Sequence, residues 1–163
     1  MHLKLTGVQQ FLLVVLRFTI GWHLFYQGWG KLQAAFWSSQ AYLAAARGPL
    51  APLFQWLAGK PDLLRVADVI TMWGLVIFGL LLMLGLFTRL AAIGGFALLL
   101  MFYLAMPPLP QSGFTVLTPE GWELYVNKTL IEALALLALA VLPTGLMAGL
   151  DVWIHNWRKR STL

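Results

Sequence analysis

Residues 8–31 form an apolar run that is long enough to cross a bilayer as a single helix. The run nevertheless contains four strongly polar side chains: Arg17, His23, Gln27 and Lys31. On a helix of about 100° per residue, these four fall within an arc of about 120°. Because charge at membrane depth is costly, we expect this arc to face neighbouring helices, where it forms internal ion pairs or a site.

The opposite face of the same run is aromatic and carries Trp22, Tyr26 and Trp29. Side chains of this type either form a belt at the membrane interface or line a slot for a flat ligand. The sequence leaves both interpretations open.

The composition is that of a membrane protein. Charged residues make up 10% of the 163 residues and hydrophobic residues 60%, whereas an ordinary soluble domain is roughly 25% charged. We therefore predict an all-α integral membrane protein with a single membrane domain, residues 1–163, built as an antiparallel four-transmembrane-helix bundle. The expected spans are residues 8–31, 66–87, 90–106 and 130–148. The first span lacks a small-residue cleavage site, so we expect it to remain in the mature protein.

Two long connections, residues 32–65 and 107–127, are expected on the outer side of the membrane. Alanine-rich and proline-containing segments predict short interfacial helices in the first of them. A basic cluster, Arg158 to Arg160, follows the last span and favours cytoplasmic termini. The net charge of +5 is explained by this topology and by anionic lipid, so no nucleic-acid binding is predicted.

The sequence also limits the possible cofactors. It contains no cysteine, which excludes disulfides, thiolate metal sites and iron–sulfur clusters. Of the three histidines only His23 lies within an expected span, because His2 and His155 lie near the chain ends. A haem held by two histidines from neighbouring helices therefore lacks a second ligand, and no metal site is predicted. Electron chemistry would need a diffusible cofactor or a partner subunit.

Depth along the expected spans predicts a polar pocket at their outer ends. The residues expected to converge there are His23, Lys31, Asp68, Lys128 and Glu132. Two alternatives remain open: His23 is a hydrogen-bonded core residue, or Lys31 and Lys128 extend to the lipid headgroups.

At the inner ends of the spans, the expected interaction is structural. Asp151 lies at the depth of Arg17 and Arg89, and we predict a salt bridge of Asp151 with one or both arginines.

Several motifs together resemble a known family. They are Arg17–His23 (RFTIGWH), Tyr26–Leu32 (YQGWGKL), Gly79–Arg89 (GLLLMLGLFTR) followed by Leu90-Ala91-Ala92, Asn127-Lys128, and Gly149–Asp151 (GLD). In this order they resemble the DoxX/DoxD family of small four-helix membrane proteins over the whole chain. That family includes the membrane subunit of thiosulfate:quinone oxidoreductase, and other members are associated with redox complexes in bacterial membranes.

The resemblance implies a quinone-linked membrane subunit in the respiratory chain of a bacterial inner (cytoplasmic) membrane. As an enzyme, such a chain would be an oxidoreductase that acts with a partner subunit or as a homo-oligomer. The expected catalytic residues are His23, which would donate a hydrogen bond, and Glu132 and Asp68, either of which would relay protons. The expected quinone- or substrate-binding residues are Trp22, Tyr26, Gln27, Trp29, Lys31 and Lys128.

Two other functions are weighed against this one. A non-catalytic anchoring or assembly subunit would use the same salt bridges only to hold the bundle together. A transporter or channel is less favoured, because the sequence has no internal repeat and no broken pair of spans.

Overall fold

The computed structural model describes residues 5–108, 116–118, 121–123, 125–153 and 156. Within these residues, three helices are long and apolar enough to cross a membrane: α1 (Gly7–Gln33), α4 (Pro61–Leu84) and α5 (Thr88–Ala105). The chain is therefore a multi-pass membrane protein. His2, His155 and the basic cluster at residues 158–160 lie outside the described residues.

The last expected span, residues 130–148, is not one continuous helix in the structure. Helix α6 (Lys128–Val141) has 14 residues, which is about 21 Å of helix and shorter than a hydrocarbon core of roughly 30 Å. It is followed by the single turn α7 (Thr144–Met147). The break lies at Pro143, since the residue before a proline disfavours the helical conformation, and Leu142 is extended, with φ −86° and ψ 137°.

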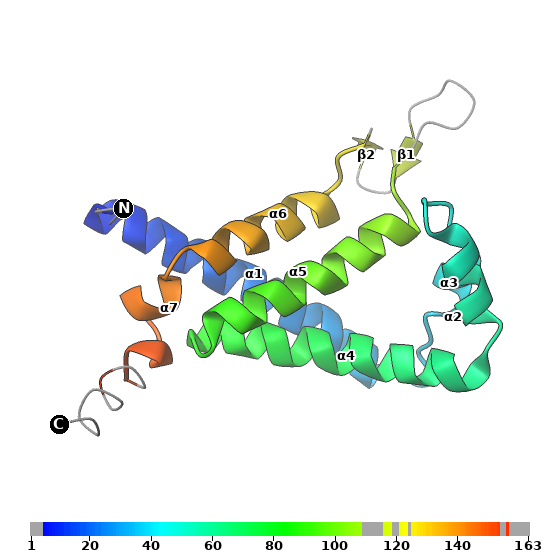
Figure 1. Ribbon diagram of the computed structural model, residues 1–163, viewed down its shortest axis with the longest axis horizontal. Coiled ribbons are helices and arrows are strands. Elements are labelled where there is room, and N and C mark those ends of the chain that lie inside the picture. Colours follow the sequence, from blue (N-terminus) through cyan, green and yellow to red (C-terminus); the bar gives the residue numbers. More distant parts are fainter. Residues whose placement is uncertain (1–4, 109–115, 119–120, 124, 154–155, 157–163) are drawn as a thin grey trace.

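Helix α1 packs mainly on α4, and α6 packs mainly on α5; in Figure 1, α1 crosses the direction of α5 and α6. Helices α4 and α5 form the predicted antiparallel hairpin. Its turn uses Gly85 in the left-handed conformation, with φ 65°, which glycine adopts without steric cost. The central core is apolar and includes Ile20 and Leu24 from α1, Leu75 and Leu82 from α4, Leu99 from α5, and Leu136 and Leu139 from α6.

Helices α1 and α4 approach closely at two glycines. A Cβ atom on Gly79 would lie 2.5 Å from the backbone nitrogen of Phe25 and 2.7 Å from the carbonyl oxygen of Gly21. Small residues of this kind allow helix backbones to meet in membranes. This contact holds α1 against α4 at a point close to His23. It therefore helps to position the polar side chains of α1.

The first long connection contains the two short helices α2 (Gln40–Ala44) and α3 (Ala51–Ala58). They dock on the ends of α4 and α5 through a second apolar cluster: Leu43, Ala46, Phe54, Ala58, Leu64 and Ala105. The backbone N–H groups of Arg47 and Gly48 both donate to the carbonyl oxygen of Ala105, at 2.9 and 3.2 Å. This connection is therefore packed onto the bundle as a cap.

The second long connection contains a small antiparallel hairpin, which an all-α prediction did not include. Strand β1 (Val116–Thr118) pairs with β2 (Gly121–Glu123), with Leu117 opposite Trp122. Figure 1 shows the hairpin at the same end of the bundle as α2 and α3, whereas α7 and the start of α1 lie at the opposite end.

Candidate functional site

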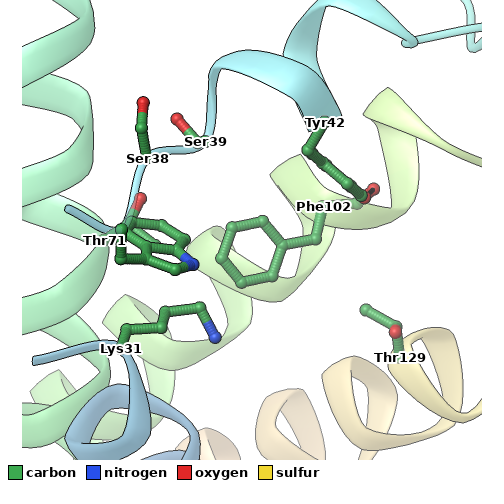
Figure 2. Close-up of a pocket in the computed structure, with 8 residues that line it drawn as sticks. Lys31, Ser38, Ser39, Tyr42, Thr71, Phe102 and Thr129 are labelled. Atoms are coloured by element: carbon green, nitrogen blue, oxygen red, sulfur yellow. Dashed lines mark hydrogen bonds between the residues drawn. The ribbon is translucent and has the colours of Figure 1, made fainter. Parts of the chain in front are cut away.

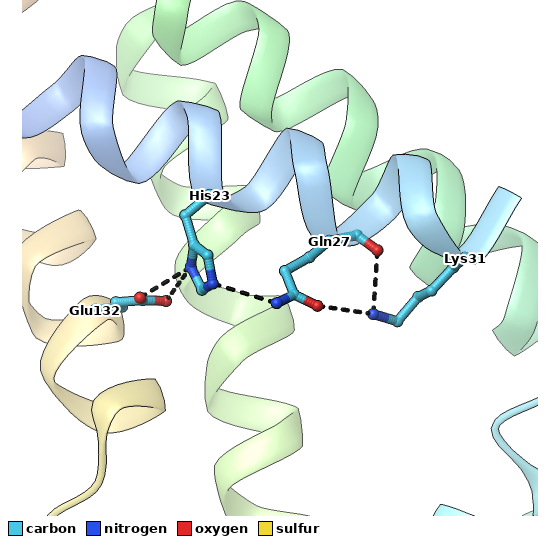
Figure 3. A network of polar contacts seen from close by, with 4 residues as sticks. All are labelled: His23, Gln27, Lys31 and Glu132. Carbon is cyan, nitrogen blue, oxygen red and sulfur yellow. Dashed lines mark hydrogen bonds and ion pairs between the residues drawn. The ribbon is translucent and has the colours of Figure 1, made fainter. Parts of the chain in front are cut away.

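A continuous chain of polar contacts runs along one side of α1, next to its buried face (Figure 3). It begins at Glu132 of α6, whose two carboxylate oxygens lie 2.9 and 3.0 Å from Nδ1 of His23. Nε2 of His23 lies 3.3 Å from Nε2 of Gln27. The ammonium of Lys31 then donates to the carbonyl oxygen of Gln27 at 3.2 Å and to its Oε1 at 3.5 Å. The predicted polar arc therefore makes contact with α6.

The hydrogen bonds of this chain have one consistent direction. With the proton on Nδ1, His23 donates to Glu132 and accepts at Nε2 from the side-chain amide of Gln27. The amide oxygen of Gln27 then accepts from Lys31. Every donor points toward the carboxylate, so a positive charge at one end is linked to a negative charge at the other.

The ion pair also holds the bundle together. Helix α1 packs mainly on α4, and α6 packs mainly on α5, so His23 and Glu132 bridge two helices that otherwise share few contacts. The side chains are partly accessible, 32% for His23 and 21% for Glu132.

A cavity of about 350 Å³ lies beneath the first connection (Figure 2). Its lining comes from the end of α1, the segment after it, and helices α2, α4, α5 and α6. The lining residues are Lys31, Trp37, Ser38, Ser39, Tyr42, Thr71, Phe102 and Thr129. Three aromatic side chains and five hydroxyl groups therefore surround one ammonium group.

Lys31 belongs to both the cavity and the polar chain. Its ammonium lies 5.6 Å from the centre of the Trp37 ring, a cation–π distance. In Figure 2 its side chain extends from α1 toward the middle of the lining residues. The polar chain therefore connects the cavity to the His23–Glu132 pair.

Tyr42 is fixed in the wall of the cavity. Its hydroxyl donates to the carbonyl oxygen of Phe102 at 2.8 Å, and the two rings meet edge to face, with centroids 6.5 Å apart. Burial raises the pKa of Tyr42 to about 12. The hydroxyl therefore stays neutral at physiological pH and keeps this donor role.

Asp68 does not join His23, in contrast to the prediction. It is buried, and its Oδ1 accepts from the backbone nitrogen of Ser39 at 2.9 Å and also from the Ser39 hydroxyl. A carboxylate buried next to a loop is stabilised most simply by the N–H groups of that loop. Asp68 therefore holds the cavity wall at Ser39 in place.

The predicted aromatic slot is not part of this cavity. Trp22, Tyr26 and Trp29 are 50%, 61% and 45% exposed on the outer face of α1, where helical periodicity places them away from His23. Trp22 stacks on Tyr26, with centroids 6.3 Å apart. Lys128 is exposed at the start of α6, next to the lining residue Thr129.

At the opposite end of the bundle, Arg17 and Asp151 form two separate sets of hydrogen bonds instead of a direct salt bridge, although the charge of Asp151 still favours that of Arg17. Arg17 is buried and donates to the carbonyl oxygens of Thr144 and Ala148, at 2.8 and 2.5 Å. The break at Pro143 brings these carbonyls to Arg17, because α7 turns back toward α1. Arg89 is exposed and forms no ion pair within the part of the chain that the structure describes.

Asp151 caps a different helix instead. Its Oδ1 accepts from the backbone nitrogen of Phe87 at 2.8 Å, and its Oδ2 accepts from the nitrogen and the hydroxyl of Thr88, at 3.1 and 2.9 Å. These donors lie at the N-terminus of α5, where free N–H groups and the helix dipole both favour a carboxylate. Asp151 is therefore structural, and its partners are two backbone N–H groups and the Thr88 hydroxyl.

Most of the cavity wall was missed by sequence reasoning. The additional lining residues are Trp37, Ser38, Ser39, Tyr42, Thr71, Phe102 and Thr129. One local signal was present, because Trp37 followed by Ser38 and Ser39 places an aromatic ring and two hydroxyls directly after the first span. The remaining residues are brought together only by the packing of four separate helices.

Comparison with known proteins identifies one family. The DoxX family model matches residues 12–108, which include most of α1, the capping helices α2 and α3, and the α4–α5 hairpin. A comparison with curated proteins finds no match. A comparison with solved structures finds none either. Because the family model covers more than half of the chain and agrees with the motifs in α1 and at residues 79–89, the chain belongs to the DoxX family.

Proposed function

We propose that this chain is a quinone-linked subunit of a bacterial membrane redox complex. The observation that carries this proposal is the direct connection between an aromatic cavity and an ionisable pair through Gln27 and Lys31. Neither the cavity nor the pair alone would favour a redox function, because aromatic cavities and partly buried polar pairs are both common in membrane bundles.

The residues that line the cavity fit a quinone head. Its volume of about 350 Å³ lies at the lower end of the roughly 300–1,000 Å³ typical of small-molecule sites. The rings of Trp37 and Phe102 offer flat apolar contacts. Lys31 offers a charged donor, and the Ser38 hydroxyl accepts from the backbone nitrogen of Gln40, which leaves its own hydrogen free to donate.

A bound quinone would supply reversible uptake of two electrons and two protons, with the electrons exchanged with a partner subunit or a small reductant. His23 and Glu132 would hold the proton that this exchange requires. Nδ1 of His23 carries it in the hydrogen-bonded arrangement, and the carboxylate of Glu132 accepts that hydrogen bond. Gln27 would couple the charge state of the pair to Lys31, because its amide contacts both.

Quinone binding can be tested through tryptophan fluorescence, which quinones quench on contact. Menadione titrated into the purified protein should quench part of the fluorescence with saturation. The saturable part should be lost in Trp37→Phe, which lines the cavity, and kept in Trp22→Phe, which lies on the outer face of α1. Linear quenching without saturation, or equal saturable quenching in both variants, would contradict the proposal. Such a result, with a stoichiometric protein partner in the purified sample, would favour an anchoring subunit.

A further inference from the structure

The charge of the cavity defines its ligand more narrowly. Among the described residues that line it, Lys31 is the only group that is charged at neutral pH, and no carboxylate is present. The cavity therefore carries a net positive charge inside a wall of aromatic rings and hydroxyls.

The contacts of Lys31 leave this charge without a counter-ion among the described residues. Its ammonium contacts the carbonyl and amide oxygens of Gln27 and faces the ring of Trp37, all of which are neutral. The two carboxylates that were expected nearby have other partners, because Glu132 pairs with His23 and Asp68 accepts from Ser39. A half-buried ammonium in this setting is stabilised by an anion that enters the cavity.

The shape of the cavity indicates what would carry that anion. Trp37, Tyr42 and Phe102 provide ring surfaces within the same space as the ammonium. A small inorganic anion would leave these surfaces unused, whereas a negative charge borne directly on a flat ring would use both. Ring and charge would then be recognised together.

We propose that the cavity selects an acidic ring compound, namely a hydroxyquinone or related phenol that is ionised at neutral pH, with its oxyanion at Lys31. This inference rests on the proposed quinone site and adds the charge of the preferred ligand. It requires binding alone and no chemical step.

The test compares two ligands that share a ring and differ in charge. Lawsone is a hydroxynaphthoquinone that is ionised at neutral pH, and its methyl ether is neutral. Binding to the purified protein in a neutral detergent is measured by calorimetry. Wild type should bind lawsone about ten- to a hundredfold more tightly than the ether, the ratio expected for one charge-assisted hydrogen bond. Lys31→Met should abolish this preference while still binding the ether.

Two control variants separate loss of charge from loss of fold. Lys31→Arg keeps the charge and should retain most of the preference for lawsone. Lys60→Met removes an exposed lysine just before α4, outside the cavity lining, and should leave the preference unchanged. Equal affinity for both ligands in wild type, or a preference that survives in Lys31→Met, would overturn the inference and leave the quinone site standing. Binding of neither ligand would overturn both.

The same anion could be the phosphate of a lipid headgroup, and one further arm distinguishes this source. Phosphatidylglycerol added to the detergent micelles should not weaken the binding of lawsone to wild type. Competitive displacement by phosphatidylglycerol, but not by phosphatidylcholine, would assign Lys31 to the membrane surface and contradict the proposal.

Discussion

Arg17 shows how a single charge can be accommodated inside the bundle without an ion pair. Its side chain is 2% exposed, and its guanidinium donates to two backbone carbonyls of the segment after α6. Hydrogen bonds to charged groups are stronger than neutral ones. Arg17 therefore ties α1 to the C-terminal part of the chain.

Replacing Arg17 by lysine should weaken this tie. Lysine keeps the charge but cannot reach both carbonyls with a planar fork, so we expect Arg17→Lys to lower the free energy of unfolding by about 1.5–3 kcal/mol. The measurement is unfolding in mixed micelles, followed by circular dichroism as the fraction of denaturing detergent rises. Arg89→Lys is the matched control and should have little effect, because Arg89 is exposed. Similar losses in both variants would show that the two carbonyl contacts do not stabilise the protein.

Some contacts of individual side chains could be predicted from the sequence, and others could not. The spacing and depth of His23 and Glu132 predicted that they would approach, and they are in contact. Asp68, Asp151 and Arg17 make their hydrogen bonds mainly with backbone groups, which the sequence did not predict. Backbone donors and acceptors are present at every residue, so no residue type in the sequence marks them.

At the scale of elements, the crossing of α1 and α4 depends on the absence of side chains. Gly79 and Gly21 meet so closely that a Cβ atom on Gly79 would lie 2.5 Å from the backbone of Phe25. Backbone atoms cannot move aside as a flexible side chain can. The whole of α1 must shift if this contact is filled.

We therefore expect Gly79→Ala to destabilise the bundle by about 1–3 kcal/mol, the usual range for overpacking a tight contact. Gly30→Ala is the control, because nothing lies within 4 Å of a Cβ atom at Gly30. Alanine favours a helix more than glycine does, so that change should be neutral or stabilising by up to about 1 kcal/mol. Both variants can be compared in the same detergent-unfolding assay. A neutral Gly79→Ala would mean that the two helices do not meet as described.

The sequence pattern predicted some elements of secondary structure but not others. The apolar runs predicted α1, α4 and α5, with α4 and α5 antiparallel. The end of α6 was missed, although Pro143 was visible, because hydropathy alone does not register a residue that stops a helix. The β1–β2 hairpin was missed because each strand has only three residues, too few for a periodic pattern.

At the scale of the whole molecule, the site exists only because separate elements converge. The cavity takes one or more lining residues from each of α1, α2, α4, α5 and α6, and its wall at Ser39 is held by Asp68 of α4. Sequence reasoning could identify the polar arc on α1 but not the lining of the cavity. That lining depends on how the first connection folds back over the bundle.

The proposed role of the ion pair leads to a prediction about turnover. Glu132→Gln keeps the size of the side chain but removes the carboxylate, and general acid–base groups typically contribute about 10²–10⁴ in rate. The rate to measure is the part of menadione reduction by washed membranes that depends on this chain. We expect this rate to fall at least about a hundredfold in Glu132→Gln and in His23→Asn. Asp62→Asn, an exposed carboxylate in the first turn of α4, should leave the rate unchanged. Wild-type rates in both site variants would exclude a proton-transfer role for the pair.

The most direct test of the quinone site is native mass spectrometry of the gently purified protein, with extraction of any quinone that it retains. Wild type and the outer-face variant Trp22→Ala should each retain close to one quinone per chain, whereas Trp37→Ala, which removes a wall of the cavity, should retain almost none. Absence of quinone from the wild-type protein, or equal retention in all three proteins, would contradict the account.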